Sequence, residues 1–292
     1  EDRVRRGTSK RAGWYARTVV RSLGAAPAVM AGCVVAVAVA AFAVCAQQTA
    51  YLSVSGFSPG YLDSLIWLFS SDRGIPLLWC IAPAALMLWL TVAGAGRHGA
   101  GWAVCHSNAR ELWIEDVVDA VVGALAFAAA CVASACAAAA AFSGAAMADF
   151  GPHGIFAAVT GQALQIPLDI VEVVFAVAVL SFLVLAVFGI AFQLGRLLLN
   201  GPAVPFAALI LLGLPAIHGP QAFLLEAARL LSFPVDPRGV TNPLSLPFEV
   251  TSLFYDSWLP GAGHGLWLQF VLFAVLFAAG LLAAPCKDCL RS

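Results

Sequence analysis

The sequence predicts an all-α fold: a polytopic helical membrane protein with six transmembrane helices and with both termini in the cytoplasm. Hydrophobic residues make up 62% of the 292 residues and charged residues only 11%, whereas charged residues make up about 25% of a typical soluble domain. Apolar runs long enough to cross a bilayer recur along the chain, and they lack the in-out alternation of barrel strands. The basic residues are also distributed very unevenly, which orients the predicted helices.

Six apolar segments are predicted to span the membrane: 24–46, 76–95, 117–145, 169–194, 203–218 and 266–284. The first follows a basic stretch, as in a signal peptide cleaved near Ala46, but its 23-residue apolar run "GAAPAVMAGCVVAVAVAAFAVCA" exceeds the roughly 7–15 residues of a signal core. A retained span is therefore favoured.

The third span is rich in alanine, and small residues let helix backbones approach closely. We therefore expect this span in the middle of the bundle. The fifth span is short and is interrupted by Pro205 and Pro215. It leads into "GPQAFLLEAARLLSF", which could form a half-inserted helix sheltered by neighbouring protein.

Six spans place both termini on one side of the membrane, and the basic residues indicate which side. Seven of the 15 Lys and Arg lie in the first 21 residues. With the termini inside, five more face the cytoplasm (Arg97, Arg110, Arg196, Lys287 and Arg291), and three face outward (Arg73, Arg229 and Arg238). Because cytoplasmic loops are enriched in Lys and Arg, both termini are predicted to be cytoplasmic.

A charged segment over 97–116, between the second and third spans, then also faces the cytoplasm. Asn108 is a good N-cap and Glu111 follows three residues later, which predicts a helix beginning near Ala109. Glu111, Glu115 and Asp119 recur every four residues and should form one acidic stripe, with Trp113 on a different face. The segment is either a solvated helix end with an interfacial Trp anchor or a docking surface for a cytoplasmic partner.

This layout resembles the six-span membrane subunit of type-2 ABC exporters over nearly the whole chain. The basic "KRAGWYARTVVRSL" is similar to that family's amphipathic N-terminal connecting helix, expected within 1–23. The segment "CHSNARELWIEDVVDA" occupies the place of the family's cytoplasmic coupling helix, although its acidic residues outnumber the basic ones. "QAFLLEAARLL" and "PFEVTSLFYDSWLPG", within 219–265, resemble the family's outer re-entrant or surface helices.

The resemblance implies that 1–292 form a single permease domain of the cytoplasmic (inner) membrane. It implies two cytoplasmic ATPase subunits and a second copy or a paralogous permease as partners, with lipid around them and no nucleic acid. The substrate would be amphipathic or hydrophobic, such as a peptide, a lipid or a drug. The partner-binding residues expected on the coupling segment are Arg110, Glu111, Trp113 and Glu115.

The sequence carries no catalytic signature of its own. A phosphate loop needs Gly-Lys-Ser/Thr, but neither of the two lysines, Lys10 and Lys287, follows a glycine. Any ATPase must therefore be a separate chain. "GFSPG" at 56–60 matches G-x-S-x-G, but it lies in a loop of a helical protein rather than in a strand-turn-helix. No enzymatic activity and no cofactor are expected.

Histidines and cysteines leave an alternative open. His153, His218 and His264 lie near predicted outer boundaries, each beside a glycine. If they converged, they could bind a metal or haem, as in a haem or metal permease. Cys286 and Cys289 form C-x-x-C in the tail, which gives two of the four ligands of a structural zinc site. A membrane scaffold without transport activity is the other alternative.

Overall fold

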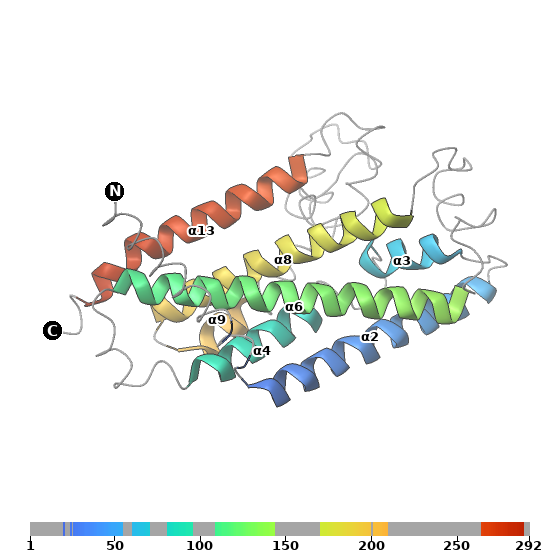
Figure 1. The fold of residues 1–292 in the computed structure, drawn as a ribbon, viewed down its shortest axis with the longest axis horizontal. Coiled ribbons are helices and arrows are strands. Elements are labelled where there is room, and N and C mark those ends of the chain that lie inside the picture. Colours follow the sequence, from blue (N-terminus) through green and yellow to red (C-terminus); the bar gives the residue numbers. More distant parts are fainter. Residues whose placement is uncertain are drawn as a thin grey trace, which may run out of the picture.

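The computed structural model describes residues 20, 24, 26–54, 60–70, 81–95, 109–143, 170–199, 201–209 and 264–288. Within these ranges every regular element is helical and no strand occurs. Figure 1 shows the helices side by side in one elongated bundle. The predicted connecting helix over 1–23 lies almost wholly outside the described residues, and so does nearly all of 219–265.

Three helices are long and apolar enough to cross a membrane: α2 (Pro27–Val54), α6 (Ala109–Ser143) and α8 (Ile170–Leu199). Two more, α4 (Ala82–Ala95) and α13 (His264–Asp288), contain shorter apolar stretches. These five helices coincide with five of the predicted spans. The all-α prediction is thus confirmed for the described residues, and the three long apolar helices are compatible with a helical membrane protein. The number of six spans and the orientation of the termini stay predictions.

The fifth predicted span is described only in part. Its first residues form the short helix α9 (Ala203–Ala208), and 210–218 lie outside the described residues. Gly195 of α8 packs directly on Pro205, since a Cβ atom at Gly195 would lie 2.4 Å from Cβ of Pro205. The chain therefore turns sharply after α8 and returns against it.

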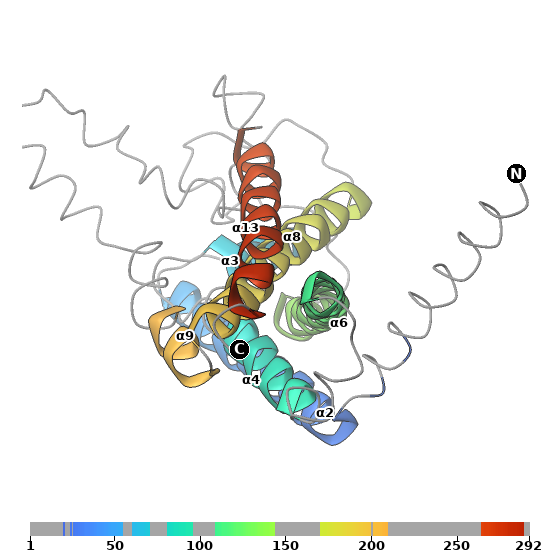
Figure 2. The same ribbon diagram turned by 90° about the vertical axis from the view of Figure 1, so that its left-hand side faces the viewer.

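Helix α6 lies in the middle of the bundle, as its small residues predict. It packs against α2, α3 (Tyr61–Ser70), α4, α8 and α13, and Figure 1 shows it running the length of the molecule between them. In the turned view of Figure 2, α8 and α13 lie above α6, and α4 and α2 lie below it. With 35 residues at about 1.5 Å each, α6 is longer than a hydrocarbon core of about 30 Å.

Glycines of α6 and α8 lie at close helix-helix contacts. A Cβ atom at Gly189 of α8 would lie 3.1 Å from Cβ of Ala120 on α6, and one at Gly123 of α6 would lie 2.6 Å from the Trp89 ring on α4. Larger side chains at these positions would separate the backbones. The small residues of α6 thus determine how near α4 and α8 come.

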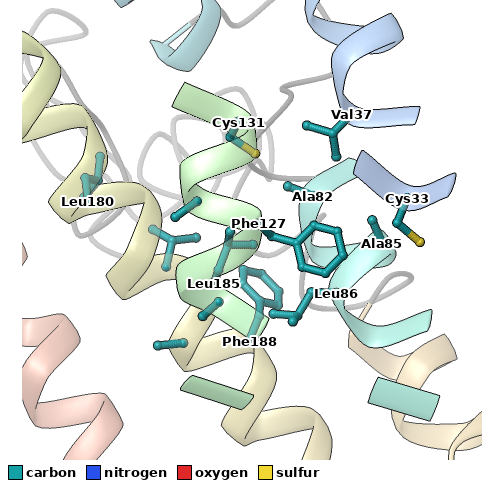
Figure 3. Close-up of a cluster of buried hydrophobic side chains, with 14 of the residues drawn as sticks. Cys33, Val37, Ala82, Ala85, Leu86, Phe127, Cys131, Leu180, Leu185 and Phe188 are labelled. Atoms are coloured by element: carbon teal, nitrogen blue, oxygen red, sulfur yellow. The ribbon is translucent and has the colours of Figure 1, made fainter. Parts of the chain in front are cut away.

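Large side chains fill the space around these contacts. Phe127 of α6 is fully buried and meets Trp89 of α4 edge-to-face, with 6.5 Å between ring centroids. Figure 3 shows Phe127 beside Leu86 of α4, with Phe188 and Leu185 of α8 next to them. This layer joins α4, α6 and α8 in one apolar core.

Helix α3 was not predicted, because its residues lie between the first two predicted spans, 24–46 and 76–95. Leu62, Leu65 and Leu68 repeat every three residues and are all buried, the spacing of one helical face. Tyr61 forms a side-chain hydrogen bond with Cys136 of α6. Burial raises the pKa of the Tyr61 phenol, and this hydrogen bond raises it further. The end of the bundle opposite Ala109 thus carries a short helix packed on α6.

Candidate functional site

Residues 109–116, the described part of the predicted docking segment, lie where four helices end at one end of the bundle. The N-terminal end of α6 meets the C-terminal ends of α4, α8 and α13, at the left of Figure 1. Helix α6 begins at Ala109, as predicted, with Glu111 in its first turn. Asn108, the predicted N-cap, lies outside the described residues. An acidic residue in the first turn interacts favourably with the positive end of the helix dipole.

Arg110 and Glu111 form the exposed tip of α6, and we use "tip" for these two residues below. Their side chains extend from the first turn of the helix, ahead of the turns that pack in the bundle. Both therefore lie where a partner outside the chain could reach them. Partner binding by Arg110 and Glu111 stays a prediction.

Trp113 does not lie at the exposed tip of α6. Its side chain is 1% exposed, and its Nε1–H donates a hydrogen bond to the backbone oxygen of Phe277 on α13, at 3.1 Å. The indole also rests on Gly280, where a Cβ atom would lie 2.1 Å from the ring atom Cε2. A buried indole N–H normally needs an acceptor, and α13 supplies it. Trp113 therefore holds two helices of this chain together and presents no surface to a partner.

The acidic stripe also turns inward after its first member. Glu115 is 4% exposed and Asp119 is 3% exposed, although both were expected on one solvated face with Glu111. Asp119 is one turn before Gly123, which packs on Leu86 and Trp89, so the stripe runs onto the face toward α4. Buried carboxylates are costly without partners, and both residues have interaction partners in the structure.

Two neighbouring helices are longer than the sequence predicted. Helix α8 was predicted to end at 194 and ends at Leu199, and α13 was predicted to end at 284 and ends at Asp288. Phe277 and Gly280, the residues that bury Trp113, nevertheless lie within the predicted span 266–284. The sequence therefore missed which face of α6 meets α13.

Arg196, on the last turn of α8, is a site residue that sequence reasoning used only to orient the spans. Its Nη1 donates to the backbone oxygen of Leu90 on α4 at 3.3 Å and to Oε1 of Gln193 at 2.9 Å. Its guanidinium also lies against Gly94, where a Cβ atom would be 2.8 Å from Nη1, and its Cζ is 5.7 Å from the centroid of Phe192. Arg196 thus joins α8 to the C-terminal half of α4.

Trp113 and Arg196 together fix the ends of the four helices. Trp113 joins α6 to α13, Arg196 joins α8 to α4, and α6 and α8 meet directly at Ala120 and Gly189. We call these three contacts the helix-end contacts. A signal for Arg196 was present in the sequence, since Gln193 and Arg196 are polar residues one turn apart at the end of an apolar helix.

Most of the predicted metal ligands lie outside the described residues, so their convergence stays a prediction. His153 and His218 lie outside the described residues, and His264 is the first residue of α13, with an undescribed side chain. Cys286 is in the last turns of α13, and Cys289 lies outside the described residues. Among the residues that the structure describes, no group of three His, Cys, Asp or Glu is placed to hold a metal ion.

Comparison of the chain with protein-family models, with curated proteins and with solved structures finds no match. The function of this chain must therefore be inferred from its packing and its sequence.

Proposed function

We propose that this chain is the permease subunit of an ATP-driven ABC exporter, with separate cytoplasmic ATPase subunits that dock on the tip of α6. The observation that carries the proposal is the continuity of α6. One unbroken helix runs from exposed Arg110 and Glu111 into the centre of the bundle, where it packs against five other helices. A force applied at the tip would therefore reach the five described helices that pack on α6.

The proposed arrangement has six spans in the cytoplasmic membrane, with both termini in the cytoplasm. The distribution of Lys and Arg supports this orientation. A second copy or a paralogous permease would complete the path, and the substrate would be amphipathic or hydrophobic, in keeping with the apolar spans. Haem or metal transport through the outer histidines and a scaffold role are the alternatives that the following experiments would reveal.

Thiol labelling of single-cysteine variants in intact cells tests the topology. Probes at Asp63, Asp149 and Pro243 should react with a membrane-impermeant maleimide added outside, and probes at Arg110 and Lys287 should react only after the membrane is opened. Labelling of the Lys287 probe in intact cells would contradict the proposed orientation.

Co-expression of the tagged chain with the ATPase subunit encoded nearest to it tests the partner. The double variant Arg110→Ala/Glu111→Ala should fold normally and lose at least ten-fold in co-purified ATPase, because interface anchors contribute about 2 kcal/mol or more. The matched control is Gln47→Ala/Ser53→Ala, which changes two exposed polar residues on α2 toward the opposite end of the bundle.

Equal recovery of the ATPase with the tip variant and the control would reject the tip as its docking site. If the unmodified chain recovers no ATPase, the exporter proposal fails and a scaffold role becomes the better explanation. A stoichiometric metal or a Soret band in the purified chain, lost in His153→Ala/His218→Ala/His264→Ala, would favour the haem or metal alternative.

A further inference from the structure

We propose that Trp113 is a positioning residue that ties the tip of α6 to the inner end of α13, so that displacement of the tip moves α13 with it. The motion of α13 would be the first step by which docking at the tip reaches the bundle. This inference rests on the proposed function for its biological role, and the tie itself can be tested without that function.

Two contacts fix the Trp113 ring against the backbone of α13. Gly280 has no side chain, so the indole reaches the backbone of α13, and a Cβ atom there would lie 2.1 Å from both Cε2 and Cζ2. One turn earlier, the oxygen of Phe277 accepts the indole N–H at 3.1 Å. The ring is therefore fixed by a flat contact and by a directed hydrogen bond, and it can neither slide along α13 nor rotate without losing one of them.

Of the close contacts at Trp113, Ala120 and Gly123, the one nearest to the tip is that of Trp113 with α13. Trp113 follows the tip by two residues and contacts α13, whereas the close contacts with α8 at Ala120 and with α4 at Gly123 come about two and three turns later. A sideways displacement at Arg110 or Glu111 therefore reaches α13 through only the few residues of α6 between the tip and Trp113. The later contacts with α8 and α4 lie farther along and provide the support about which α6 can tilt.

Helix α13 is also able to respond. It packs against α8 and α6, and its outward face carries exposed apolar side chains: Phe270, Val271, Val275 and Leu282. Figure 2 shows α13 at the edge of the bundle, with α8 and α6 on one side. Apolar surface in a bilayer meets lipid tails of similar polarity, so a shift of α13 against lipid disrupts few specific contacts.

Amide hydrogen exchange of the chain in nanodiscs tests the tie without any partner. Gly280→Ala changes only α13, yet it should increase exchange in residues 109–116 of α6 at least three-fold, because the indole is displaced. Trp113→Phe removes the N–H donor and keeps most of the ring, and it should increase exchange there about two-fold. Gly32→Ala on α2 is the matched control, since a Cβ atom there meets nothing within 4 Å, and it should change nothing.

The same variants with the co-expressed ATPase test whether the tie transmits motion. In the unmodified chain, ATP with vanadate should alter exchange across residues 270–284 of α13. Trp113→Phe and Gly280→Ala should bind the ATPase as well as the unmodified chain, because Arg110 and Glu111 are intact, but they should lose at least half of that response. A merely structural role would not separate binding from response in this way.

Unchanged exchange at 109–116 in Gly280→Ala and in Trp113→Phe would overturn the tie. A full α13 response in both variants would also overturn it as a transmitting contact. If Gly280→Ala does not fold, the milder Trp113→Phe decides between these outcomes. Failure of the unmodified chain to bind any ATPase would defeat the exporter proposal alone, and the partner-free measurement would still decide whether the tie exists.

Discussion

The first and the second turns of α6 look alike in sequence and behave differently in the structure. Arg110 and Glu111 in the first turn are exposed, whereas Trp113 and Glu115, only a few residues later, are 1% and 4% exposed. Both turns carry charged residues, so both could be assigned to one partner surface. Their difference shows that a short helical segment can hold a partner surface and a structural contact within a single turn of each other.

The difference arises from the neighbours of α6 and not from α6 itself. Phe277 and Gly280 of α13 pack on Trp113 in the second turn of α6, whereas Arg110 and Glu111 in the first turn are exposed. Charge in the second turn is therefore interior charge that requires partners, and charge in the first turn lies at the exposed surface. Substitutions in the two turns should consequently differ in what they damage.

The largest effect is expected for Trp113→Ala. It removes a fully buried ring and the hydrogen bond to the Phe277 oxygen, and loss of a buried Trp side chain costs about 3–5 kcal/mol. The melting temperature in detergent should therefore fall much further than for any change at the tip. A melting temperature within about 1 °C of that of the unmodified chain would contradict the close packing on α13.

A smaller loss is expected for the buried carboxylates. Glu115→Ala and Asp119→Ala each remove a buried group that has partners, and an unsatisfied partner left behind costs about 1–3 kcal/mol. Glu111→Ala is the matched control on the exposed turn. Equal stability of Glu115→Ala and Glu111→Ala would show that the acidic stripe is solvated along its whole length.

A double-mutant cycle would identify the counterpart of these carboxylates. The stripe runs onto the α4 side of α6, and Arg196 reaches that region by bonding the Leu90 oxygen and lying against Gly94. We therefore expect Glu115→Gln and Arg196→Met to show a coupling energy of about 0.5 kcal/mol or more. Strict additivity of the two changes would remove Arg196 as the counterpart.

How far the sequence predicted this molecule depends on whether a feature is local or arises between helices. The apolar runs predicted the locations of α2, α4, α6, α8 and α13, because hydropathy is a property of each segment. The Ala-rich composition of α6 predicted its central position. Helix α3 was missed although Leu62, Leu65 and Leu68 repeat at helical spacing, because the segment was classified by its place between spans.

The helix-end contacts could not be predicted in the same way. The hydrogen bond from Trp113 to Phe277 joins residues 164 apart in the sequence, and the bond from Arg196 to Leu90 joins residues 106 apart. A helical-wheel argument distinguishes the faces of one helix but not which face meets another. Exposure of Arg110 and Glu111 was predicted correctly because their position at the start of the helix decides it.

The smallest effect on stability is expected at the tip itself. Arg110→Ala and Glu111→Ala change exposed side chains, and such changes usually alter stability by about 0.5 kcal/mol or less. Thermal unfolding in detergent should therefore place both variants within about 2 °C of the unmodified chain, even though the proposed function assigns them the greatest effect on ATPase recovery. A drop comparable to that of Trp113→Ala would show that Arg110 and Glu111 belong to the packed bundle, and the distinction between the two turns of α6 would then be lost.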